Sequence, residues 1–256
     1  MKKIKNSFSY YFIEPIQDFK AGNNNSLSDS NSSIYRFLFA TTFILLLFLM
    51  PIASQDFGRS TDETFSESYG RDILAYYESG GKDKAVFDLS NPSYKDLIYY
   101  GLSFDFFCAI VNKYISPFGD FETRHFLNAL IGLLGMLIAS LLGKKYGGWR
   151  TAWLVLIFMA ITSRYFAHSM NNSKDIPLAT AYIAGVFFTL KFLEELPKPK
   201  WKTILLLLAS IGLASSVRIG GMILFAYLGL FVFIKWIVIY FREKSKALDK
   251  KLIGSY

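Results

Sequence analysis

Four short groups of charged and polar residues stand beside apolar segments of this sequence, and their types suit chemistry on phosphates and hydroxyls. These groups are Asp62-Glu63, Arg124-His125, the stretch from Arg164 to Asp175 (RYFAHSMNNSKD), and Arg218. A carboxylate about one turn beyond a membrane span can meet a substrate whose lipid tail lies in the bilayer. Guanidinium groups bind phosphate through two parallel hydrogen bonds. Together the four groups could build a polar cavity at the membrane boundary.

Each group also has a simpler interpretation. Acidic pairs in exposed loops usually face water, and arginines at the ends of spans extend their side chains to the membrane interface. His125 and His168 can serve as hydrogen-bonding groups only. Lys174 and Asp175 can form a local ion pair at a helix start, with Asp175 capping the helix ahead of Pro177. The residue types alone leave both interpretations open.

The composition indicates a membrane protein with a substantial extramembrane part. The 256 residues are 52% hydrophobic and have a mean hydropathy of +0.30, which is too apolar for an ordinary soluble domain. A single cysteine, Cys108, excludes a disulfide framework within the chain, and with only two histidines it leaves too few ligands for a structural zinc site. The net charge of +8 is spread along the chain, which argues against nucleic acid as a partner.

Runs without charged residues predict an all-α integral membrane protein with about six transmembrane helices, since a span needs ~20 mostly apolar residues. Some of these runs contain or adjoin a basic residue near one end. Such a residue does not exclude a span, because its long side chain can reach the membrane interface. The expected spans are Phe37 to Ala53, His125 to Gly143, Thr151 to Phe166, Ile176 to Leu193, Thr203 to Val217 and Ile219 to Phe241.

Basic residues divide unevenly between the two sides of such a bundle. With the N-terminus inside, the segments 1–36, 144–150, 191–202 and 235–256 share one side and hold most of the 28 Lys and Arg residues. The positive-inside rule then places this side in the cytoplasm. We expect a flexible cytoplasmic tail over residues 1–35, a transmembrane module over 36–241 and a basic cytoplasmic tail over 242–256.

The first span is followed by a long outer loop, residues 54–124, which contains a further apolar stretch. This stretch, Tyr99 to Ile115, carries Asp105 in its middle and Lys113 near its end. A carboxylate at that depth in lipid would be costly, and a seventh span would place the later basic clusters outside. We therefore predict an aromatic-rich helix that lies in the membrane interface.

The order of these features resembles a known family. An apolar span, an early Asp-Glu and a long outer loop are followed by RHFLNALIG, then by SRYFAHSMNNSKDIPLA, and finally by GLASSVRIGG. The arrangement is similar to the N-terminal half of GT-C class glycosyltransferases close to family 39, which includes the protein O-mannosyltransferases and the lipid A aminoarabinose transferases. The similarity extends over roughly Phe37 to Tyr240.

The resemblance implies a sugar transfer from a polyprenyl-phosphate donor to a lipid, glycan or protein acceptor outside the cytoplasm, with inversion at the anomeric carbon. It also implies a multi-pass protein of a bacterial plasma membrane. Asp62 matches the family's base, with Glu63 beside it, and Asp175 matches the acid of the second outer loop. The candidates for the donor phosphate are Arg124, Arg218, Lys174 and His168.

Phosphate is already a good leaving group, so one base and a few cations meet the chemical requirement. No cofactor follows from the sequence, and a divalent metal, if one is used, must rely on carboxylates. Members of the class are roughly twice this long, so we expect a truncated or shortened relative. Two alternatives stay open: a non-catalytic membrane scaffold or partner subunit, and a small transporter with charges along its path.

Overall fold

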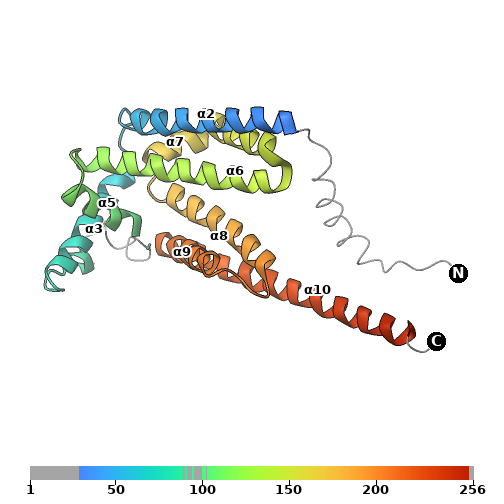
Figure 1. Ribbon diagram of the computed structural model, residues 1–256. Helices are drawn as coiled ribbons and strands as arrows, with labels where there is room; N and C mark the ends of the chain where they lie inside the picture. The colour runs from blue at the N-terminus through green and yellow to red at the C-terminus, as the bar shows by residue number, and fades with distance from the viewer. Residues whose placement is uncertain (1–28, 89, 91–93, 95–99, 102, 254–256) are drawn as a thin grey trace.

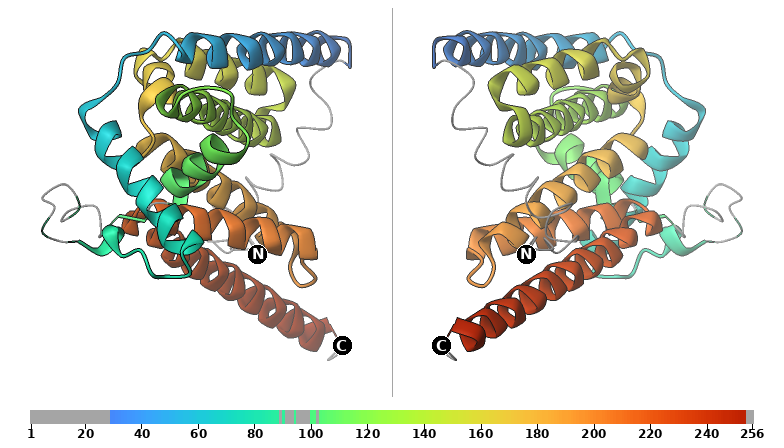
Figure 2. Two further views of the ribbon diagram at one scale, coloured as in Figure 1. Left: turned by 90° about the vertical axis from the view of Figure 1, so that its left-hand side faces the viewer. Right: turned by 90° about the vertical axis from the view of Figure 1, so that its right-hand side faces the viewer.

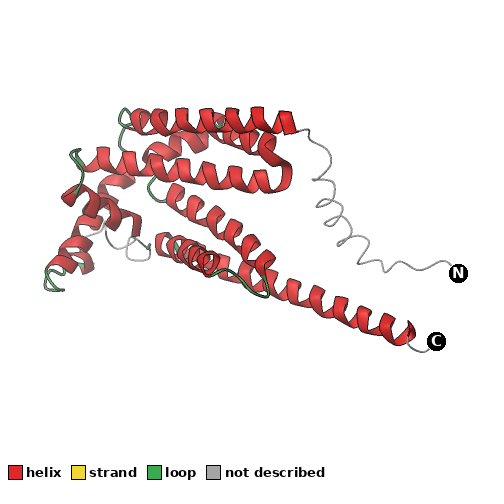
Figure 3. Ribbon diagram, in the orientation of Figure 1, coloured by secondary structure: helices red, strands yellow, loops and turns green. Residues whose placement is uncertain are grey.

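The computed structural model describes residues 29–88, 90, 94, 100–101 and 103–253, and within these ranges it contains helices and no strand (Figure 1, Figure 3). The prediction of an all-α protein is thus confirmed. The long helices are α2 (Asp29–Ser54), α6 (Asp120–Ile161), α8 (Asp175–Glu195), α9 (Trp201–Val217) and α10 (Ile223–Ile253). The shorter ones are α3 (Thr61–Glu78), α5 (Ser103–Tyr114), α7 (Ser163–Asn171) and the 3-10 turns η2 (Ala85–Phe87) and η3 (Ile219–Met222).

Four stretches of the described chain are long and apolar enough to cross a bilayer. They are Ser33–Ser54, Asp120–Ile161, Asp175–Glu195 and Ile219–Arg242, and α9 adds a shorter apolar helix of 17 residues. The chain is therefore a multi-pass integral membrane protein, as predicted. At the two ends of the described chain, α2 begins at Asp29 and α10 continues to Ile253. Residues 1–28 of the expected N-terminal tail lie outside the described residues.

The 42-residue helix α6 is a hairpin of two arms, which correspond to the second and third expected spans. Gly147 and Gly148 leave the helical conformation, and Gly148 has φ +71°, a left-handed value that favours glycine. A Cβ added to Gly143 would lie 2.9 Å from Cγ2 of Val155. Twelve residues of straight helix would separate these positions by about 18 Å, so the second arm must fold back along the first.

The third expected span ends earlier than predicted. Its helix stops at Ile161, and the extended backbone of Thr162 (φ −70°, ψ 99°) separates it from α7. The Thr162 backbone N–H (3.0 Å) and its hydroxyl (2.6 Å) both donate to the Phe158 carbonyl at the end of α6. Residues Ser163 to Phe166 consequently belong to α7, which carries part of the polar stretch noted in the sequence.

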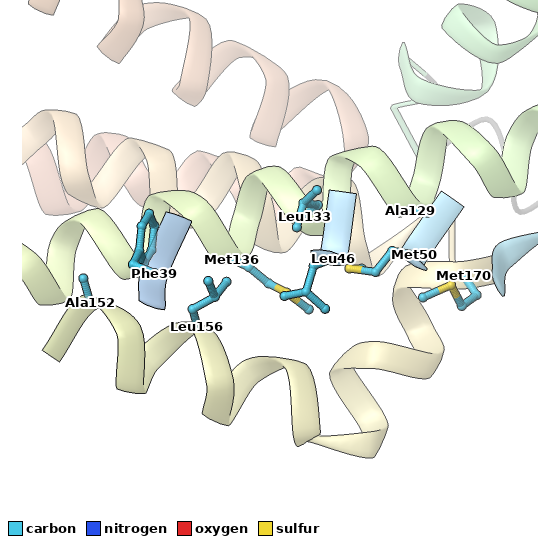
Figure 4. Packing of buried hydrophobic residues seen from close by; sticks show 9 residues of the cluster. All are labelled: Phe39, Leu46, Met50, Ala129, Leu133, Met136, Ala152, Leu156 and Met170. Atoms are coloured by element: carbon cyan, nitrogen blue, oxygen red, sulfur yellow. The ribbon is translucent and has the colours of Figure 1, made fainter. Parts of the chain in front are cut away.

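One apolar core joins α2, both arms of α6 and α7 (Figure 4). Small residues let these helices approach closely, as in other membrane bundles. A Cβ on Gly132 would lie 2.4 Å from Oγ of Ser169 in α7, so only glycine fits there. The buried members of this core are Phe39, Leu46, Met50, Ala129, Leu133, Met136, Ala152, Leu156 and Met170.

Hydrogen bonds between helices supplement this packing. The Asn128 amide in α6 donates to the carbonyls of His168 (3.0 Å) and Ser169 (3.1 Å), and Thr180 of α8 donates to the Ile131 carbonyl (3.0 Å). Such bonds matter in lipid, where an unpaired polar group has no water to bind. They fix α7 and α8 against the first arm of α6.

A second layer consists of α8, α9 and α10, in which Ala181, Leu207, Ile211, Ala214 and Leu224 form a separate apolar cluster. In Figures 1 and 2, α8 lies between α6 and α9, and α10 extends away from the rest of the bundle. The helices α3 and α5 gather at the opposite end (Figure 1).

The extra helix in the long loop is too short to span the bilayer. α5 has 12 residues, or about 18 Å, against a hydrocarbon core of about 30 Å. It packs against α3 and α6 and buries Phe104, Asp105 and Cys108. The sequence predicts an aromatic-rich helix in the membrane interface, and the structure adds that these three side chains turn inward. Tyr99, the expected first residue, lies outside the described residues.

Candidate functional site

A polar hollow of about 350 Å³ lies where the N-terminus of α3, the segment between α7 and α8, and the end of α9 meet. Residues distant in sequence line it: 60–62 from the start of α3, 168 and 171–175 from the second segment, and Arg218 just after α9. Five predicted site residues therefore come together. They are Asp62, His168, Lys174, Asp175 and Arg218.

Two ion pairs cross this hollow. Lys174 Nζ lies 3.4 Å from Oδ2 of Asp62, and Nη1 of Arg218 donates to Oδ1 of Asp175 at 2.8 Å. Both acids are open to solvent, with 73% of the Asp62 side chain and 51% of the Asp175 side chain exposed. Each cation is thus held beside an acid that a ligand can reach. The local pair between Lys174 and Asp175, which the sequence left open, does not form.

Asn172 organises the start of α8. Its side-chain oxygen accepts the backbone N–H of Asp175 at 2.9 Å, so Asn172 occupies the capping role considered for Asp175. Its amide nitrogen lies 3.0 Å from Oδ2 of Asp175 and 2.6 Å from Nδ1 of His168. His168 consequently supports the loop that carries Lys174 and Asp175, in addition to lining the hollow.

Glu63 turns away from the hollow into the protein. Its carboxylate accepts the backbone N–H of Ser60 at 2.6 Å, and its other oxygen lies 2.8 Å from Nε2 of His125. The opposite ring nitrogen of His125 faces the Ser54 carbonyl at 3.2 Å. Both ring nitrogens thus face oxygen atoms, one on α2 and one on α3. His125 ties the end of α2 to the start of α3, and this fixes the backbone beside Asp62.

Arg124 is also buried rather than displayed in the hollow. Only 3% of its side chain is exposed; its guanidinium forms an ion pair with Asp105 of α5 and donates to Ser173 Oγ at 2.9 Å. Ser173 lines the hollow, so Arg124 connects α5 to the loop that holds Lys174. The expected direct contact between Arg124 and a phosphate is replaced in this structure by a contact with Asp105.

The comparisons with known proteins can be set beside this geometry. Residues 83–253 match the family model described as dolichyl-phosphate-mannose-protein mannosyltransferase, which covers well over half of the chain. The chain belongs to this family. Neither the curated proteins nor the solved structures gave a significant match.

Membership in the dolichyl-phosphate-mannose-protein mannosyltransferase family, which falls in glycosyltransferase family 39 of the GT-C class, agrees with the resemblance seen in the sequence. It supports a membrane glycosyltransferase that uses a polyprenyl-phosphate-linked sugar. The matched region contains His168, Lys174, Asp175 and Arg218 but begins after Asp62. The family match therefore covers Asp175 and both cations of the hollow, and Asp62 lies before the matched range.

Several residues around this hollow could not be identified from the sequence. In the sequence, Asp105 argues against a membrane span. Nothing in the sequence indicates its ion pair with Arg124. Asn172 was noted only within a glycosylation pattern, although its position three residues before Asp175 is typical of a helix cap. Tyr100 lies in an aromatic stretch of the sequence, and no motif there distinguishes it as a site residue. No group of three His, Cys, Asp or Glu side chains in the described ranges is placed to hold a metal ion.

Proposed function

We propose that this chain transfers a sugar from a polyprenyl-phosphate donor to a hydroxyl acceptor on the extracytoplasmic face, with inversion, and that the hollow is its site. The observation that carries the proposal is the meeting of two cations, Lys174 and Arg218, with two exposed acids at the start of α3, the start of α8 and the end of α9. A lipid-linked phosphate would lie at this level, with its polyprenyl tail beside the helices.

The residues divide between two tasks. Asp62 is the base, because its carboxylate is the more exposed of the two acids and can accept a proton from an incoming hydroxyl. The hydroxyl oxygen then bonds to the anomeric carbon as the bond from that carbon to the phosphate oxygen breaks. Lys174 and Arg218 stabilise the negative charge that develops on the departing phosphate. A single displacement of this kind inverts the anomeric centre.

The remaining predicted residues hold this arrangement in place. Glu63 and His125 fix the start of α3, and Arg124 fixes Ser173 beside Lys174. Asp175 orients Arg218 through their 2.8 Å contact. In this assignment Glu63, Arg124 and His168 act through neighbouring residues, whereas Asp62, Lys174 and Arg218 touch the substrates.

Donor binding tests the assignment of the cations. We would reconstitute the chain in liposomes and measure the affinity for dolichyl-phosphate mannose. Charge-assisted hydrogen bonds contribute ~1.5–3 kcal/mol each, so Lys174→Ala and Arg218→Ala should each weaken binding by roughly 10–100-fold. Lys145→Ala is the matched control, because Lys145 pairs with Glu194 at 2.8 Å, away from the hollow. Unchanged affinity in the double variant Lys174→Ala/Arg218→Ala would contradict the proposal.

A further inference from the structure

Tyr100, from the connection between α3 and α5, brings an aromatic ring beside the two cations that line the hollow. Lys174 Nζ lies over this ring at 5.5 Å from its centroid, and Cζ of Arg218 lies over it at 5.4 Å. Each cation also contacts its own acid. The five side chains thus form a continuous series, Asp62, Lys174, Tyr100, Arg218 and Asp175, with the ring at its centre.

The backbone next to Tyr100 is anchored on α9. A Cβ added to Gly101 would lie 1.9 Å from the Ser216 carbonyl oxygen, so only glycine allows the loop to approach this closely. The hydroxyls of Ser103 and Ser216 lie 2.8 Å apart, within hydrogen-bonding distance. Ser216 is two residues before Arg218, so these contacts place Tyr100 beside the same helix end that presents the arginine.

The chemistry of the ring explains why it suits this position. Two like charges that must face one ligand repel each other, and long basic side chains have many rotamers. The negative face of an aromatic ring attracts cations within about 6 Å, which both groups satisfy. Tyr100 is 37% exposed, so part of its surface is open to solvent.

We propose that Tyr100 is a positioning residue of the donor site, which holds Lys174 and Arg218 together so that both can bind one lipid-linked phosphate. This inference rests on the proposed function of the hollow. It deepens that proposal, because it makes the affinity for the donor depend on a ring that contributes no charge of its own.

The test compares the ring with its hydroxyl. Binding of dolichyl-phosphate mannose, and of dolichyl phosphate alone, would be measured for the full chain in liposomes. Tyr100→Phe keeps the ring and should bind within about 2-fold of wild type, whereas Tyr100→Leu should lose roughly 5–30-fold in affinity for both lipids. Tyr77→Leu, at an exposed tyrosine of α3, is the control and should change nothing.

A double-mutant cycle separates positioning from a general structural effect. If Tyr100 acts through the two cations, Tyr100→Leu should cost less than about 2-fold in the Lys174→Ala/Arg218→Ala background. An equal loss in both backgrounds would overturn the inference, as would a Tyr100→Phe variant as weak as Tyr100→Leu. Normal binding by Tyr100→Leu, with weak binding by the cation double variant, would refute the role of Tyr100 alone. Normal binding by the cation double variant would refute the proposed function itself.

Discussion

Replacement of Asp62 by asparagine distinguishes a catalytic base from a surface acid. The change preserves the shape of the side chain and removes the proton acceptor. Its structural cost should be small, because Asp62 is 73% exposed and its contact with Lys174 is 3.4 Å. Exposed ion pairs of this kind contribute about 0–1 kcal/mol. Loss of general-base catalysis, by contrast, typically lowers a rate ~10²–10⁴-fold, or about 3–5 kcal/mol in the barrier.

This difference in magnitude makes the assay decisive. Liposomes that contain the chain would be supplied with radiolabelled dolichyl-phosphate mannose and an acceptor peptide with serine and threonine hydroxyls. We expect Asp62→Asn to bind the donor within about 5-fold of wild type, whereas its turnover falls at least 100-fold. Asp56→Asn, at an exposed acid shortly after α2, should behave as wild type. Turnover by Asp62→Asn within a few-fold of wild type would remove Asp62 from the mechanism and shift the assignment to Asp175.

Three further predictions concern the stability and the topology of the chain. Arg124→Ala should destabilise the protein by about 3–5 kcal/mol, because it leaves Asp105 buried without its partner. Thermal unfolding in detergent would measure this loss. Lys113→Ala, at an exposed ion pair, is the control and should change the unfolding temperature very little. Burial raises the pKa of Glu67 despite Arg71 nearby, so the folded state favours the protonated acid and loses stability as pH rises through this pKa. Glu67→Gln should therefore unfold at a higher temperature than wild type at pH 8 and at a similar one at pH 4; an equal shift at both values would exclude the buried charge as its cause. Single cysteines at Ser79 and Ser116 should be labelled from the same outer side of the membrane. The native Cys108 is buried and should add little background labelling. Labelling of the two positions from opposite sides would contradict the predicted topology.

The apolar helices were the most predictable part of the structure. Lipid penalises charge so strongly that runs such as Phe37 to Ala53 identify spans without knowledge of their neighbours. The turn at Gly147-Gly148 follows from the short basic segment between two such runs. The helix boundary at Thr162 does not follow from the sequence. A single residue with extended backbone ends the helix there, in a stretch without proline or glycine.

The sequence predicted which residues gather at the hollow better than it predicted the directions of their side chains. The predicted topology places Asp62, the 164–175 stretch and Arg218 at the same membrane surface. The structure brings residues from all three around one hollow. The inward turn of Arg124 depends on Asp105, which α5 presents only after it has packed on α6. The place of Tyr100 depends on the close approach of Gly101 to Ser216. Contacts between segments this distant in sequence leave no local pattern to detect.

The burial of the ion pairs decides which cations can serve a ligand. A phosphate that enters the hollow must compete with the acid that already contacts each cation. Displacement of Asp62 from Lys174, or of Asp175 from Arg218, is inexpensive because both acids are exposed and can return to water. Displacement of Asp105 from Arg124 would leave a carboxylate with 4% exposure unpaired inside the protein, at a cost of about 3–5 kcal/mol. A donor phosphate therefore gains most from Lys174 and Arg218, and the buried Arg124 serves the site best by keeping the loop before α8 in place.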